Sequence, residues 1–519
     1  MPLQLIAFSL RTVTAGLILI SFLRFIKRSW YQSATRLPGP APHPVVGHLF
    51  QVPKRQTWKY FESLSQRYGP VIGLDLAGDN LVILNHPDDA EELLNRRSHN
   101  YSSRKPLVYA GKYQSHGKRL VLLPYGPELK RHRAAFHQML QPKVVGSYES
   151  MQEEESAKFL YDMLVNPSDA DQHSKRYAAA TVFRLSYGKR LSDDNEDLRQ
   201  VLTILDGFIR DCYPGSHLVD IFPLLDSLPD FLAPWRLSAR RKHEYEIQLY
   251  ARLIEEAKTR LSSGDDSDCF ASRLLQANES SMLDDESLAY VVGSAFEAGT
   301  DTTAGTLMWF LMAVILYPEA LRKAQAEIDS LSDVSPSHPP DFGHMSSLPY
   351  CIALTKELFR WMPAAPGGFP HLSDVDDMYK GYLIKAKSMV IPNIWAMQHN
   401  GDLFTDPLSF NPDRFMRDID GRDDLTQGHY GFGFGRRICP GRYLGARTVW
   451  IGIVRLMWAF NISPGKDAGG RPILPDPDHC TSGITSKPLP FVYILTPRSG
   501  EHEKTVHNMC KSSQSRLCR

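Results

Sequence analysis

The residues best suited to do chemistry are grouped around one cysteine, Cys439, in the run FGFGRRICPGRYLGA. The run fits the pattern F-x-x-G-x-R-x-C-x-G at Phe432, Gly435, Arg437, Cys439 and Gly441. At average residue usage, five such fixed positions coincide by chance in a chain of 519 residues less than about once in ten thousand. The pattern therefore marks Cys439 as a functional residue rather than a small buried hydrophobe.

The surroundings of Cys439 favour a thiolate that binds the metal of a flat cofactor. Glycines at positions 431, 433 and 435 let the backbone turn tightly and lie against a flat group. Pro440 suits the first turn of a helix, and a long apolar run to Phe460 follows it. We expect a thiolate there, because the helix dipole, the loop amides and Arg437 would stabilise the anion. One thiolate without a second metal ligand nearby suits an axial ligand of haem iron.

The other cysteines and the composition exclude several classes of protein. The remaining six cysteines form no C-x-x-C pair, which argues against a disulfide scaffold and a structural zinc site; they are Cys212, Cys269, Cys351, Cys480, Cys510 and Cys518. A formal net charge of +1 gives no bias toward nucleic acid. With 43% hydrophobic and 23% charged residues, the chain is globular, and the lack of a long linker favours one large domain.

An apolar segment near the start predicts a membrane anchor within residues 1–30. The residues from Leu3 to Ile26 are long enough as a helix to cross a bilayer core of about 30 Å. Arg24 and the following Lys27 and Arg28 favour a cytosolic location for the side of the chain that follows. The alternative is a cleaved signal peptide, because the uninterrupted apolar part is only as long as a signal core. We expect a single-pass protein of the endoplasmic reticulum membrane with its catalytic domain in the cytosol.

The rest of the chain is expected to be mainly α with smaller β-sheets, an α+β class dominated by helices. Apolar periodicity predicts helices over Val144–Leu164, Arg240–Leu261, Glu286–Leu316 and Glu319–Leu331. Short β-like runs cover Val71–Leu76, Leu81–Asn85 and Phe491–Leu495. One domain is expected over residues 31–497, and the polar tail of residues 498–519 is expected to be disordered.

The cysteine motif resembles that of the cytochromes P-450, and the resemblance extends from about Leu37 to Ser499. The run FEAGTDTTAG fits the family's A-G-x-D-T-T, although alone it is weak because most apolar helices that contain threonine are core. In the family this helix crosses the oxygen-binding face of the haem. The resemblance implies that Gly299 permits close approach there, and that Asp301 and Thr302 relay protons to bound dioxygen.

Two further matches imply a structural triad of Glu357, Arg360 and Arg414. KELFR places Glu357 and Arg360 on one face of a helix, a pair too common to be informative alone. NPDRF fits the family's P-E/D-R-F element, whose arginine, here Arg414, joins that pair. Such a buried network supports the cysteine loop without doing chemistry.

The resemblance also implies contacts to the haem beyond Cys439. YGPELKRHR fits the family's W-x-x-x-R helix in part, with Arg133 as a partner of a haem propionate and Leu129 in place of the tryptophan. Lys130 could substitute for the missing hydrogen bond. His371, in GFPHLSD, falls where the family often has another propionate contact, and a packed or surface histidine is equally compatible with the sequence. Phe432, Arg437 and Gly441 belong to the cofactor-binding loop.

The reaction implied is a monooxygenation of a lipophilic small molecule with O2 at haem b. The sequence has no nicotinamide or flavin motif, so NADPH and flavins would act only through a separate cytochrome P-450 reductase. Basic residues for its docking are Lys130, Arg131, Arg436 and Arg442. Two segments are similar to those of fungal members of the family that act in secondary metabolism: GFGFGRRICPG and VIPNIWAMQHN. This similarity implies a terpenoid or polyketide substrate.

The segments implied to line the substrate site are Ser103–Leu123, Ser294–Thr302, Ala364–Phe369 and Ser482–Thr485. Two alternatives remain open at this point. A haem-thiolate isomerase or dehydratase would need neither O2 nor electrons, and apolar residues at 301 and 302 would favour it. A non-catalytic haem sensor would have no use for a proton-relay helix.

Overall fold

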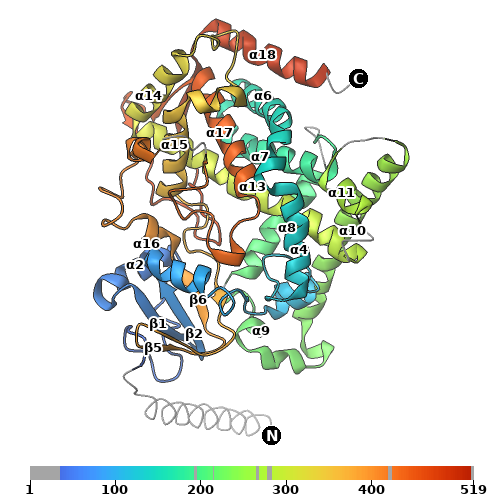
Figure 1. Ribbon diagram of the computed structural model, residues 1–519, viewed down its shortest axis with the longest axis vertical. Helices are drawn as coiled ribbons and strands as arrows, with labels where there is room; N and C mark the ends of the chain where they lie inside the picture. Colours follow the sequence, from blue (N-terminus) through green and yellow to red (C-terminus); the bar gives the residue numbers. More distant parts are fainter. Residues whose placement is uncertain are drawn as a thin grey trace. The chain divides into compact units, whose positions relative to one another are not determined.

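The computed structural model describes residues 35–191, 196–213, 215–264, 268–277, 283–418 and 424–515. The expected membrane anchor of residues 1–30 lies outside the described residues. The described chain forms two units, coloured along the sequence in Figure 1. The first unit holds residues 35–105, 367–397 and 434–437, and the second holds the remainder.

The first unit is built on a four-stranded sheet of order β1-β2-β6-β3. Its strands are β1 (Val71–Leu76), β2 (Asp79–Leu84), β3 (His371–Leu372) and β6 (Met389–Pro392). β2 pairs antiparallel with β1 and parallel with β6, and β3 pairs antiparallel with β6, where His371 lies opposite Val390. Helix α2 (Thr57–Tyr68) packs its buried Phe61 against Ile72 and Ile83 of the sheet. Burial of this apolar face fixes the register of the strands.

Short elements complete the first unit. They are α3 (Pro87–Ala90), η1 (Glu91–Arg96), the hairpin of β4 (Asp377–Tyr379) and β5 (Tyr382–Ile384), α16 (Ile394–Gln398) and η9 (Gly435–Arg437). Gly435 has a φ of 58°, and a Cβ there would lie 2.0 Å from the carbonyl oxygen of Leu94. Only glycine fits this turn of the cysteine motif.

The second unit is mainly helical. Its long helices are α4 (Pro127–Leu140), α6 (Glu149–Val165), α7 (Ala170–Tyr187), α8 (Glu196–Cys212), α10 (Pro234–Ser262), α13 (Asp285–Leu316), α14 (Pro318–Asp329), α15 (Pro349–Trp361), α17 (Arg442–Ala459) and α18 (Gly500–Ser515). Shorter ones are η2 (Val108–Gln114), α5 (Pro142–Val145), α9 (Leu218–Ile221), α11 (Phe270–Gln276) and η8 (Pro412–Asp418). A small antiparallel sheet has the order β8-β7-β9, formed by β8 (Pro472–Ile473), β7 (Phe460–Lys466) and β9 (Tyr493–Pro497).

Helix α13 is the central helix of the second unit and contacts α7, α10 and α17 (Figure 1). Its N-cap Asp284 accepts a hydrogen bond from the N–H of Ser287, which fixes where the helix begins. The helix is long and apolar enough to cross a membrane, but most of it is buried inside the unit. Its apolar surface is therefore core surface.

The fold class expected from the sequence is confirmed: the chain is mainly helical with small sheets. The run Val71–Leu76 forms β1 over the same residues, and the periodic run Glu286–Leu316 lies within α13. The run Val144–Leu164 is interrupted at its start, because a 3₁₀ turn at Gly146–Tyr148 separates α5 from α6. Boundaries of this kind depend on local turns that periodicity does not register.

The expectation of a disordered tail is wrong for most of its length. Residues Gly500–Ser515 form α18, which packs against α6. Its buried side chains are His502, Val506 and Cys510, and the ring of His502 lies edge-on to Trp458. These three residues are four apart and make one narrow stripe, which the buried Ser513 extends; apart from Gly500 and Met509, the other positions of the helix are polar. Because this stripe is so narrow, the apolar periodicity of the sequence is weak, and the segment therefore resembles a polar tail.

Candidate functional site

Cys439 lies in a loop that a backbone hydrogen bond closes just before α17. The N–H of Cys439 donates to the carbonyl of Phe432 at 2.9 Å, and Gly441 is the N-cap of α17. Gly433 has a φ of 75°, and a Cβ there would meet no atom within 4 Å. The loop therefore places the thiol next to the N-terminus of α17. The glycine backbone of the loop leaves space beside it, because no side chain extends from it there.

We expected the neighbours of Cys439 to hold it as a thiolate, which requires them to lower the pKa of its thiol. The shift of this pKa is in the opposite direction. Burial raises the pKa of the Cys439 thiol, and the Gly441 N–H, Arg133 and Arg442 oppose this only in part. A bound metal ion deprotonates a coordinating thiol by its own charge. The surrounding donors would then stabilise the sulfur once it is a ligand, rather than create the thiolate beforehand.

The structure brings the three predicted triad residues together. Arg360 donates to both oxygens of Glu357, with Nε to Oε2 at 2.7 Å and Nη2 to Oε1 at 2.8 Å. Arg414 on η8 donates from Nε to Oε1 of the same carboxylate at 3.0 Å. The side chains of Glu357 and Arg360 have no exposed surface. Their charges are therefore balanced only by one another, by Arg414 and by main-chain groups.

A chain of hydrogen bonds connects the triad to the cysteine loop. Arg360 donates to the carbonyl of Gln398 at 2.9 Å. The side chain of Gln398 donates to the carbonyl of Phe359 and accepts from the N–H of Tyr430 at 3.1 Å. The ring of Phe432 packs on Phe359, with centroids 5.2 Å apart. The triad thus positions the segment that holds the N–H of Cys439.

The middle of α13 carries the predicted proton-relay residues. Asp301 accepts a hydrogen bond from the hydroxyl of Thr485 at 2.7 Å, and Thr302 donates its hydroxyl to the carbonyl of Ala298 at 2.8 Å. Both side chains are half-buried. Because the Thr302 hydrogen is committed to Ala298, its oxygen remains an acceptor toward any other group.

The role expected for Gly299 is different from what the structure shows. A Cβ at Gly299 would lie 2.5 Å from Cγ2 of Val182, so this glycine permits the close packing of α13 on α7. The sequence motif alone does not distinguish close approach to a cofactor from close approach to a neighbouring helix.

Arg133, on α4, contacts the cysteine loop directly. Its Nη1 donates to the carbonyl of Ile438 at 2.7 Å, and burial lowers the pKa of its guanidinium. Leu129, which replaces the family's tryptophan, is buried. Lys130 is exposed, with its Nζ 5.4 Å from the ring centroid of Tyr125. The propionate contact predicted for Arg133 remains a prediction.

In the first unit, His371 lies in a buried group of positively charged or basic side chains. Its Nδ1 is 2.7 Å from the carbonyl of Tyr101, so Nδ1 carries the hydrogen. Burial, followed by Arg104, lowers the pKa of His371 well below its usual value. Arg437 donates from Nε to the carbonyl of Ser102 at 2.7 Å.

Arg104 is the member of this group that sequence reasoning missed. It donates to the carbonyls of Phe369, at 3.0 Å, and Pro370, at 2.5 Å, while its buried Nε has no protein partner. Burial and the neighbouring Arg437 lower its pKa to about 9. Buried like charges with an unsatisfied donor fit an anionic group such as a carboxylate. The surrounding sequence, SSRK, did not indicate that Arg104 is buried, because a lone arginine in such a polar run is usually exposed.

Sequence reasoning also missed a buried ionic network in the second unit. Arg119 pairs with Glu246 of α10 at 2.5 Å and with Glu297 of α13 at 3.2 Å. All three side chains are at most 5% exposed, and Arg119 also lies over the ring of Phe208 at 3.7 Å. Arg119 and Glu297 fall in two segments expected to line the substrate site. These two segments therefore contain buried charged side chains, which are paired with each other.

Parts of all four predicted lining segments are connected by contacts in the second unit. The Arg119–Glu297 pair joins the segment of residues 106–123 to α13, and the Thr485–Asp301 hydrogen bond joins α13 to residues 482–485. The N–H of Ser486 donates to the carbonyl of Ala364 at 2.9 Å, which adds the segment that follows α15.

The family model described as Cytochrome P450 matches residues 37–495 of this chain. The chain belongs to the cytochrome P450 family. Members of this family are haem-dependent monooxygenases, so the chain is an oxidoreductase with haem as its cofactor. Cytochrome P450 monooxygenase aneD of Aspergillus aculeatus is 34% identical over 506 residues, covering 97% of this chain and 94% of that protein. Cytochrome P450 monooxygenase 58 of Postia placenta is 33% identical, covering 94% and 93%.

A solved structure confirms the cytochrome P450 fold. A zebrafish cytochrome P450 with abiraterone has a TM-score of 0.71, covering 86% of this chain and 99% of that chain, at 22% identity. The donor set of the present structure fits haem. In the second unit, a single cysteine thiol in a glycine-bounded loop next to a helix N-terminus suits a ligand of the haem iron.

Proposed function

We propose that this cytochrome P450 is a microsomal monooxygenase of fungal secondary metabolism that takes electrons from a separate NADPH-dependent reductase. The observation that carries the monooxygenase reaction is the polar pair Asp301 and Thr302 in the middle of α13, with Asp301 hydrogen-bonded to Thr485. An isomerase or dehydratase would not need this pair. The apolar N-terminal segment and the fungal origin of the relatives described above support the membrane and fungal parts of the proposal.

In the second unit, haem would be held by the thiol of Cys439 and by Arg133. The family resemblance implies that His371 and Arg437 also bind its propionates. Phe432 and Gly441 would shape the loop around the sulfur. When bound, the haem supplies O2 activation, and the thiolate donates electron density that favours O–O cleavage. Neutral His371 has its hydrogen on Nδ1, so its Nε2 would have to gain a proton to donate to a propionate.

The proton delivery is proposed to run through Asp301 and Thr302. Asp301 is half-exposed and can exchange protons with solvent, while the Thr485 hydroxyl fixes its orientation. The Thr302 oxygen accepts a hydrogen bond from a water molecule and holds it near the helix, because its own hydrogen is donated to Ala298.

Replacing Thr302 by alanine is expected to leave haem binding unchanged and to lower the product formed per NADPH at least severalfold. The hydroxyl oxygen that would position the proton-delivering water is lost, so electrons are released as peroxide instead. The matched control is Thr300→Ala, since Thr300 makes the same bond to the carbonyl four residues earlier and is fully buried. Equal product per NADPH in Thr302→Ala and the wild type would make Thr302 a packing residue.

The reductase is proposed to dock at α4, the helix that contacts the cysteine loop through Arg133 and on which Lys130 is exposed. Arg131 is engaged by Glu128, and Arg442 donates to the carbonyl of Cys439 at 3.2 Å, which leaves Lys130 as the residue to test in this unit. Exposed charges act mainly on association and are screened over about 10 Å at 0.1 M salt.

Lys130→Glu is therefore expected to slow reduction by the reductase severalfold at low salt and little at high salt, with the CO spectrum unchanged. Lys511→Glu, an exposed charge reversal on α18, is the control. Stopped-flow reduction at two salt concentrations measures the effect. A wild-type rate for Lys130→Glu at low salt would remove this residue from the docking surface.

The substrate is proposed to be a neutral lipophile, such as a terpenoid or a polyketide, because the buried charges Arg119 and Glu297 of the lining segments are paired with each other. The test is co-expression of the full chain with a reductase, followed by untargeted comparison of extracts under ¹⁶O2 and ¹⁸O2. We expect a product that appears only with the active chain and carries one oxygen atom from O2. A product without that label would favour the isomerase or dehydratase.

A further inference from the structure

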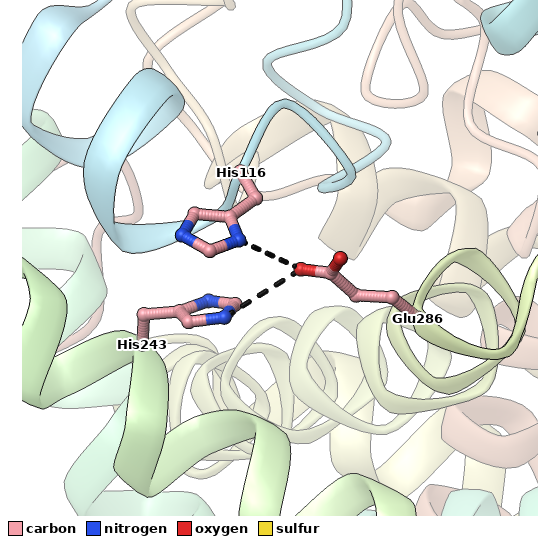
Figure 2. Close-up of side chains that lie close together, drawn as sticks. All are labelled: His116, His243 and Glu286. Atoms are coloured by element: carbon pink, nitrogen blue, oxygen red, sulfur yellow. Dashed lines mark hydrogen bonds and ion pairs between the residues drawn. The ribbon is translucent and has the colours of Figure 1, made fainter.

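Two histidines and a glutamate from three separate elements meet at one point of the second unit (Figure 2). His116 follows η2, His243 lies in the middle of α10, and Glu286 is in the first turn of α13. Nδ1 of His116 is 3.0 Å from Oε1 of Glu286, and Nε2 of His243 is 3.5 Å from the same oxygen. All three ligand atoms lie within 4.8 Å of one another.

These separations match those of ligands around one small cation. With metal to nitrogen and metal to oxygen distances of about 2.0 to 2.2 Å, tetrahedral ligand atoms lie about 3.4 Å apart. The rings of His116 and His243 are stacked with centroids 3.5 Å apart and planes 25° from parallel, so both present a nitrogen to the same carboxylate (Figure 2). Because the lone pair of each ring nitrogen lies in its ring plane, the two rings must tilt apart to direct both nitrogens at one ion.

The hydrogen bonds of His243 set the tautomer that a metal ligand requires. Its Nδ1 lies 3.1 Å from both the carbonyl of Gln114 and the hydroxyl of Tyr290. That hydroxyl can donate to the same carbonyl and to Oε2 of Glu246, so we assign the hydrogen of His243 to Nδ1. The Nε2 lone pair of the neutral ring then faces the Glu286 carboxylate, and two acceptors meet unless a cation lies between them. An N–H donated to a backbone carbonyl is the usual outer contact of a metal-bound histidine.

The surroundings supply net negative charge and access to solvent. Glu244 lies near His243, and Lys118, which lies near Glu286, is bound by Asp284 at 2.8 Å. The side chains of His116 and Glu286 are 44% and 33% exposed, whereas that of His243 is 11% exposed. Solvent therefore reaches the fourth position. His116 has a φ of 47°, which turns its side chain back toward α10 and α13.

We propose that His116, His243 and Glu286 bind a divalent first-row transition ion, with Zn²⁺ as the best match, and water as the fourth ligand. The ion would tie the segment around His116 to α10 and α13. The proposal is independent of the substrate and the reductase, because it rests only on these three side chains and their neighbours.

The test is calorimetric titration of ZnCl2 into the full-length holoenzyme, made without a histidine tag and treated beforehand with a chelator. We expect one high-affinity ion per chain, no comparable binding of Mg²⁺, and X-ray absorption with nitrogen and oxygen neighbours and no sulfur. Hydrogen exchange in η2 and the following turn should slow when zinc is added, because the ion would cross-link them to two helices.

His116→Asn is the deciding variant, because asparagine tolerates the left-handed backbone and removes the ligand. Its zinc affinity should fall at least tenfold, as should that of Glu286→Gln, with the CO spectrum unchanged. His137→Ala, on an exposed position of α4, should bind zinc as the wild type does. Failure of the wild type to bind zinc, or unchanged affinity in both ligand variants, would overturn the proposal.

Discussion

Replacing Glu357 by alanine is expected to give a chain that does not reach the folded, haem-loaded state. The change leaves the guanidinium groups of Arg360 and Arg414 without the carboxylate that both now contact. Breaking a buried ion pair from one side costs about 3 to 5 kcal/mol. Since the net stability of folded domains is about 5 to 15 kcal/mol, such a loss is a large fraction of the total. Soluble yield, haem content and thermal unfolding measure it.

The chain contains a matched control for this prediction. Glu196 and Arg199 on α8 have the same three-residue spacing, but their side chains are 62% and 70% exposed. Exposed pairs contribute about 0 to 1 kcal/mol, so Glu196→Ala should fold and bind haem normally. If Glu357→Ala were as stable as Glu196→Ala, the triad would have no structural role in this protein.

The second large effect is expected at Cys439. Cys439→Ala should fold, because the change removes one sulfur atom from a half-buried site, and it should lose all NADPH-driven product formation. Alanine offers no ligand to the iron, and the electron donation that favours O–O cleavage is lost with the sulfur. Product formation and haem content, measured with an excess of reductase, test this.

Cys212→Ala is the control, because Cys212 is also half-buried and lies in α8, outside the cysteine motif. It should retain activity and haem. Product formation by Cys439→Ala at a rate near that of the control would show that the thiol does not serve the reaction.

Much of the site was predictable because its residues are grouped in short motifs. The spacing of Glu357 and Arg360 places both on one helix face, and the structure confirms their contact. The mainly helical class and β1 follow from periodicity. The contact of Arg414 with Glu357, more than fifty residues earlier in the chain, was predicted only from the family resemblance, because residue spacing does not show long-range contacts.

Other features could not be predicted because they depend on burial and on contacts between distant segments. Arg104 and Arg119 look like ordinary surface arginines, and only the folded structure shows their burial. The pKa of Cys439 depends on the balance between burial and local donors, which a motif does not contain. Gly299 faces Val182 of α7, a helix more than one hundred residues away in the chain.

The central claim, that Cys439 binds haem iron as a thiolate, is tested most directly by the absorption spectrum of the reduced protein with CO. The wild-type holoenzyme is expected to show the red-shifted Soret band of thiolate ligation, and Cys439→Ala is expected to lack it. A wild-type spectrum without the red shift, or the same shifted band in Cys439→Ala, would contradict the assignment.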